Sequence, residues 1–140
     1  MWGSTVKELR MACLAVNENF PLEDEVEVRV LIENVSTDKE IVLTENRPFL
    51  DYEVNVNRVG AEQVPMTDYG KDLRNPEIRP LFGSRKRVKI TPDQPYIFRY
   101  PLYQYFNLKR VGEYEITISR PDWKDEKGEL KAPPFLFRVV

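Results

Sequence analysis

The sequence predicts an all-β domain, a two-sheet antiparallel β-sandwich of about seven or eight strands, with residues 1–140 forming a single unit. Three observations predict it. Apolar residues recur at every second position in many short runs, the 11 prolines fall almost entirely between those runs, and no long amphipathic helix interrupts them. A closed antiparallel barrel is the alternative topology.

The clearest alternating run is VEVRVLI, residues 26–32, in which valine and isoleucine take one side and charged residues take most of the other. Such a pattern is typical of an antiparallel strand with one buried face and one wet face. The expected strands cover residues 7–16, 26–32, 41–44, 52–56, 88–90, 96–100, 114–118 and 135–139.

The pieces between these runs are rich in turn-forming residues or lack alternation. Residues 102–108 are crowded with aromatic side chains, and we expect one helical turn there that crosses from one sheet to the other. The remaining connections cover residues 17–25, 36–40, 58–62, 91–95 and 121–134.

The stretch NLKRVGEYEI, residues 107–116, follows the expected crossing. A tyrosine at such a position commonly sends its hydroxyl back to upstream backbone, forming a tyrosine corner. We therefore interpret Gly112 as the residue that permits a close approach or a positive φ, and Tyr114 as the residue that closes the corner. The alternative is that the pair marks the rim of a binding site.

Four segments resemble an immunoglobulin- or fibronectin type III-like module of bacterial secreted and envelope proteins. They are WGSTVKELRMACLAVNENFPLEDEVEVRVLIENVSTDKEIVL, DYEVNVNRVGAEQVPMTDYGKDL, ITPDQPY and YFNLKRVGEYEITISR. The resemblance implies an immunoglobulin-like sandwich and an extracytoplasmic setting in bacteria. The chain departs from the usual Pro-Gly turn at residues 92–94, which read Pro-Asp-Gln.

A more distant likeness is to the intracellular proteinase inhibitor domain of Bacillus-type bacteria, carried by Asn34-Val35-Ser36 after the expected second strand. It implies a β-sandwich proteinase inhibitor as the alternative function, and no reactive-site residue can be carried over.

Composition narrows the classes of function. The 21 basic and 23 acidic residues nearly balance, so no overall field favours nucleic acid. Without histidine the chain lacks the usual general base and the commonest zinc ligand, so we expect no enzyme, no cofactor and no metal. The single cysteine, Cys13, is expected to be a small buried hydrophobe. No apolar stretch approaches the ~18 residues of a transmembrane helix, so we expect no membrane insertion.

The connection over residues 60–87 is the longest, and its apolar and aromatic residues predict that it packs partly against the sandwich. Its polar and aromatic side chains are the predicted partner-binding residues. The run Arg85-Lys86-Arg87 has an alternative interpretation, because three adjacent basic residues are more often simply solvated. The candidates are Tyr69, Arg74, Arg79, Arg85 and Lys86.

Trp123 lies in the 121–134 segment, which we interpret as a hairpin. It either presents a platform for a sugar or a protein partner, or folds back to cap the core. The acidic residues near it match no calcium-binding motif, so a solvated turn is the better interpretation.

The function expected from the sequence is therefore a non-catalytic protein-interaction or accessory binding module, with its partner surface on the 60–87 connection and the 121–134 hairpin. A protein is the expected partner and carbohydrate the alternative ligand. The sequence leaves the oligomeric state open.

Overall fold

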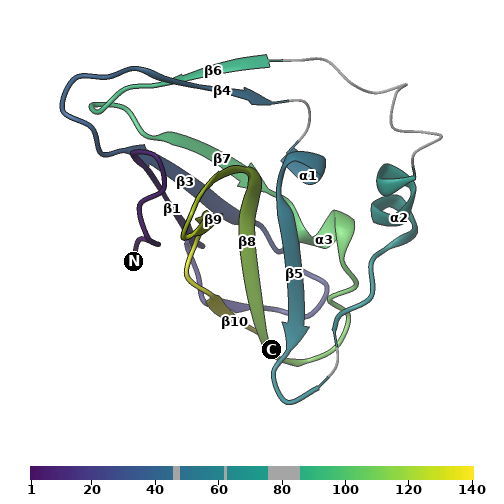
Figure 1. Ribbon diagram of the computed structural model, residues 1–140. Coiled ribbons are helices and arrows are strands. Elements are labelled where there is room, and N and C mark those ends of the chain that lie inside the picture. The colour runs from purple at the N-terminus through teal and green to yellow at the C-terminus, as the bar shows by residue number, and fades with distance from the viewer. Residues whose placement is uncertain (46–47, 62, 76–85) are drawn as a thin grey trace.

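The computed structural model describes residues 1–45, 48–61, 63–75 and 86–140, and in them the predicted all-β antiparallel sandwich is confirmed (Figure 1). Sheet A has the order β1-β3-β7, with bounds Leu9–Leu14, Val28–Asn34 and Tyr96–Tyr100. All its pairs are antiparallel.

Sheet B has the order β2-β10-β8-β5, and β9 pairs with the C-terminal half of β8. Its strands are β2 Asn19–Phe20, β5 Glu53–Arg58, β8 Gly112–Asp125, β9 Gly128–Lys131 and β10 Phe135–Val139. The pair β2–β10 is parallel and the others are antiparallel.

The strands β4 (Ile41–Glu45) and β6 (Lys86–Ile90) pair only with each other and form a two-stranded ribbon, sheet C. The inner face of this ribbon buries Leu43, Val88 and Ile90 in the common core. Alternation predicted both strands, although their separation from the two main sheets was not predicted.

Three short helices complete the described chain: α1 Pro48–Asp51, α2 Asp68–Arg74 and α3 Leu102–Tyr105. Helix α3 is the predicted crossing, because it connects β7 of sheet A with β8 of sheet B. Helix α2 lies within the 60–87 connection and packs against α3 (Figure 1).

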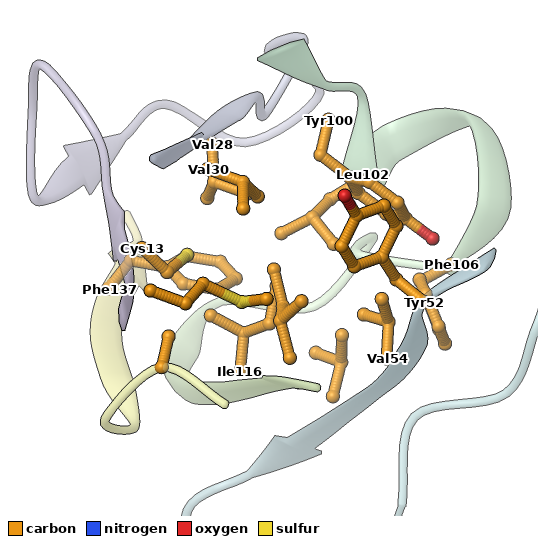
Figure 2. Packing of buried hydrophobic residues seen from close by; sticks show 14 of the residues in the cluster. Cys13, Val28, Val30, Tyr52, Val54, Tyr100, Leu102, Phe106, Ile116 and Phe137 are labelled. Atoms are coloured by element: carbon orange, nitrogen blue, oxygen red, sulfur yellow. The ribbon is translucent and has the colours of Figure 1, made fainter. Parts of the chain in front are cut away.

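The core lies between the inner faces of sheets A and B (Figure 2). Val28 and Val30 of β3 face Ile116 of β8 and Val54 of β5 across it, as period-two strands require. The ring of Tyr114 stacks on that of Phe137 at a centroid distance of 5.4 Å. Cys13 is buried in the same cluster, and burial raises the pKa of its thiol to about 12.

Candidate binding surfaces

Helix α2 is fastened to α3 through Thr67, the residue at its N-cap. The Oγ1 of Thr67 accepts from the backbone N–H of Gly70 (3.1 Å) and donates to the carbonyl of Gln104 (2.5 Å). The backbone N–H of Thr67 donates to Tyr105 O at 2.9 Å. A side-chain cap satisfies N–H groups that a short helix leaves open, so the start of α2 is fixed in position.

Gly70 sets how closely the two helices approach. A Cβ at this position would lie 2.6 Å from the carbonyl oxygen of Tyr105, so only glycine allows the contact. Beside it, the rings of Tyr69 and Tyr105 stack with centroids 5.9 Å apart and planes 12° apart. We call Tyr69 and Arg74 of α2, together with Tyr105 of α3, the α2–α3 surface.

The predicted site residues do not form one surface. Tyr69 is 53% exposed and Arg74 is exposed, both on α2. Lys86 is exposed at the start of β6, opposite Glu45 on the ribbon. Arg79 and Arg85 lie outside the described residues.

Trp123 lies near the far end of β8 and folds back towards the N-terminal segment. Its Nε1–H donates to Val6 O at 2.9 Å, and Lys7 Nζ lies 5.8 Å from its ring centroid. The ring is half-buried against the core. Of the two alternatives for this tryptophan, the structure has the one in which it folds back onto the core. The segment predicted as a hairpin contains the antiparallel pair formed by the end of β8, which runs to Asp125, and β9, which begins at Gly128.

Tyr114 makes the hydrogen bond that defines a tyrosine corner, since its hydroxyl donates to the carbonyl of Arg110 at 2.5 Å. Gly112 has φ +155°, and a Cβ there would lie 2.8 Å from Nε of Arg58. The Nη2 of Arg58 in turn donates to Val111 O at 2.9 Å. Glycine is favoured here because of its positive φ, which other residues adopt only with strain, while the Arg58 side chain packs against this backbone.

A buried polar cluster joins sheet C to both main sheets, and the sequence did not reveal it. Arg120 of β8 is 1% exposed and Glu45 of β4 is 5% exposed. The Oε1 of Glu45 accepts from Tyr52 Oη (2.7 Å) and from Arg120 Nη1 (3.4 Å), and its Oε2 accepts from Tyr96 Oη (2.7 Å). Arg120 also donates to Thr44 O and to Asp122.

Burial and neighbouring groups shift the pKa values of Tyr52 and Arg120 in this cluster. Burial raises the pKa of Tyr52 well above its ordinary value, and the neighbouring Glu45 carboxylate raises it further. Burial opposes the charge on Arg120, but hydrogen bonds to Asp122 and Tyr52 outweigh it and raise the Arg120 pKa. The cluster is saturated with internal partners, so we interpret it as an attachment of the ribbon rather than a site of chemistry.

An open groove on the outer face of sheet B is the second feature that the sequence did not reveal. Its volume is about 530 Å³. Three stretches meet there: residues 2–4, the outward residues of β5 and β8, and the segment from β9 to Pro134. We call it the Trp2 groove, and the side chains that define it are Trp2, Glu53, Asn55, Thr117, Ser119, Glu129 and Lys131.

In the described residues no group of three or more His, Cys, Asp or Glu side chains is arranged to hold a metal ion. Among those same residues, no helix has the length and apolarity needed to cross a membrane.

The fold and these surfaces define a small all-β sandwich domain with solvent-open hollows. No protein-family model matches the sequence, and no curated protein sequence matches it. Two solved structures of a β-glucosidase from Listeria innocua are similar in fold, one of them a mutant in complex with laminaribiose.

Both solved structures are 12% identical in sequence to this chain, with a TM-score of 0.45. The matches cover 95% and 94% of this chain and 16% of each β-glucosidase chain. Similarity at this level assigns no activity and no ligand to the domain.

Proposed function

We propose that the chain is a non-catalytic binding module that recognises a protein partner through the α2–α3 surface. The observation that carries the proposal is the exposed Tyr69 ring stacked on Tyr105, on a helix whose start is fixed by the Thr67 cap. A rigid, exposed tyrosine supplies large contact area at low entropic cost, and Arg74 beside it supplies charge. Recognition residues held on a rigid scaffold are the usual arrangement of interaction modules.

A photo-crosslinking residue placed at position 69 tests this proposal in a lysate of the native host. We expect one protein to be crosslinked at a defined stoichiometry, and we expect Arg74→Ala to reduce its yield. The matched control carries the crosslinker at Val42, which is exposed on strand β4 of the ribbon and belongs to neither α2 nor α3. Equal crosslinking from both positions would contradict a specific α2–α3 surface.

Assays of serine proteinases in the presence of the purified domain distinguish this function from proteinase inhibition. The described part of the 60–87 connection contains a capped helix, whereas an inhibitory loop is held extended for an enzyme cleft. We therefore expect serine proteinases to be unaffected by the domain. Stoichiometric inhibition of any member of a proteinase panel would replace the present proposal.

The proposal includes the extracytoplasmic bacterial setting implied by the resemblance to immunoglobulin- and fibronectin type III-like modules. Fractionation of the native host, with an antibody against the domain, measures it directly. Recovery of the protein in the cytoplasmic fraction alone would remove this part of the proposal and leave the partner surface in place.

A further inference from the structure

We propose that the Trp2 groove is a second binding site and that its ligand is a neutral oligosaccharide. The site is separate from the α2–α3 surface, because it lies on the outer face of sheet B and contains none of the residues of α2 or α3. Its volume of about 530 Å³ falls within the range of about 300–1,000 Å³ that ligand sites occupy.

A tight turn brings Trp2 to this face. Lys7 and Glu8 have φ values of 45° and 68°, and the backbones of Val6 and Leu9 hydrogen bond to each other in both directions. Two central residues at positive φ are what a two-residue hairpin of type I′ requires. The chain before the turn therefore returns alongside β1, where Gly3 N donates to Met11 O at 2.9 Å.

Gly3 lets this returning segment fit between β1 and β9. A Cβ at position 3 would collide with the carbonyl oxygen of Lys131. One residue earlier, the guanidinium of Arg10 lies 4.6 Å from the ring centroid of Trp2, and Arg10 is itself held by Glu33 at 2.9 Å. The indole is thus fixed by a cation–π contact while it also lines the groove.

Most polar side chains of the groove have no hydrogen bond within the described chain, the exception being Asn55, whose Oδ1 accepts from Gln63 Nε2 at 3.4 Å. In the described chain, the side chains of Glu53, Thr117, Ser119, Glu129 and Lys131 make no hydrogen bond or ion pair within the protein. They stand on the outer face because their neighbours Val54, Ile116 and Ile118 point into the core. Such a face offers both donors and acceptors to a ligand.

The architecture favours a saccharide over other ligands. At Ser119, β8 is paired with β5 on one side and with β9 on the other, so the strand at the centre of the floor has no free edge there with which to recognise a peptide backbone. The charges of Glu53 and Glu129 exceed that of Lys131, which disfavours phosphate-bearing ligands. An aromatic ring that lines the same groove as hydroxyl and carboxylate groups suits a sugar, which has apolar C–H faces and many hydroxyls.

Tryptophan fluorescence tests the site directly, because the chain has two tryptophans. In the variant Trp123→Phe the emission comes from Trp2 alone. The probes are short neutral oligosaccharides of glucan, xylan, mannan and chitin type, with calorimetry as the second measurement. We expect one class to change the Trp2 emission saturably, and the addition of Thr117→Val to weaken that binding several-fold.

Calorimetry on single variants that keep Trp123 compares their affinities for the saccharide. We expect Trp2→Ala to weaken saccharide binding by about tenfold or more, and Tyr69→Ala to leave it unchanged. The absence of saturable binding for every probe would overturn the saccharide site, as would binding that survives Trp2→Ala in a folded variant. Binding of a peptide rather than a sugar, lost in Trp2→Ala, would also overturn it.

Discussion

Arg120 shows how one buried side chain can join parts of the chain that are distant in sequence. All five of its N–H donors have partners, on Thr44, Glu45, Tyr52 and Asp122. A guanidinium with such low exposure would be costly if any of these partners were absent. Asp122 is 67% exposed, so Glu45 supplies the buried counter-charge.

Replacing Glu45 by Gln should therefore lower the free energy of unfolding by roughly 3–5 kcal/mol, because Arg120 keeps its buried charge and loses the buried carboxylate. Urea denaturation measures the change. The double variant Glu45→Gln with Arg120→Met is the control, since removing both charges should cost less than the two single losses added together. Strictly additive losses would show that the two charges are not coupled.

Tyr114 provides a second test at the level of a single residue. Its hydroxyl is bonded to Arg110 O, while its ring stacks on Phe137. Replacement by Phe keeps the ring and removes the bond, so the unfolding free energy should fall by about 1–2 kcal/mol. An unchanged denaturation midpoint would mean that the corner contributes nothing to stability.

At the scale of an element, α2 owes its position to contacts outside its own sequence. Seven residues form too short a helix to be stable alone, so the Thr67 cap and the packing on α3 must hold it. The close approach at Gly70 is the geometric condition for that packing.

Substitution of Gly70 by Ala tests this condition through the sign of its effect. In the interior of an ordinary helix, replacing glycine by alanine raises the stability by about 1 kcal/mol. Here the added methyl group meets the Tyr105 backbone, so we expect a loss of about 1–3 kcal/mol by thermal or urea denaturation. Lys71→Ala, at the adjacent exposed position, is the control and should change stability little. A gain of stability in Gly70→Ala would show that α2 does not need the close contact.

The strands were predictable because alternation is a local property that one buried face imposes. Residues 26–32 needed only their own sequence to indicate β3. The two-residue strand β2 carries too few residues for a pattern, and β9 has Leu130 as its one buried residue, so neither was predicted.

The sites were harder to predict because their residues meet only through tertiary structure. Glu45 and Arg120 are 75 positions apart, and each alone looks like an ordinary charged residue. The groove unites Trp2 with Thr117 and Lys131 in the same way. The sequence offers one signal for the groove, the small residues Gly3 and Ser4 after Trp2. This signal indicates a close approach only once the turn at Lys7 and Glu8 is known.

For the whole molecule, stability should fall when the pH rises above about 10, the ordinary pKa of tyrosine. Burial raises the pKa of Tyr52 and of Tyr100 above that value in the folded state. The unfolded chain then binds fewer protons than the folded one, so the unfolding free energy decreases as pH increases, by up to about 1.4 kcal/mol per unit for each tyrosine. Urea denaturation between mildly and strongly alkaline pH measures this slope.

The variant Tyr52→Phe separates the tyrosine contribution from that of the lysines, which titrate in the same range. We expect it to reduce the alkaline slope, whereas Tyr69→Phe, at an exposed position, should leave the slope as it is. Equal slopes for all three proteins would show that the buried hydroxyl of Tyr52 does not control the alkaline limit of the fold.

Cys13 reports whether the sandwich unfolds as one unit. Its side chain points into the core between the sheets, and burial raises its pKa to about 12, so at mildly alkaline pH the folded thiol is both inaccessible and protonated (Figure 2). Alkylation should therefore require global opening, and its rate should rise with urea in parallel with the fall in unfolding free energy. A variant with Ile116→Val, in the same cluster but on the other sheet, should speed alkylation by the factor that its stability loss of about 0.5–1.5 kcal/mol predicts. Alkylation that is fast and independent of urea would mean that β1 opens separately from sheet B.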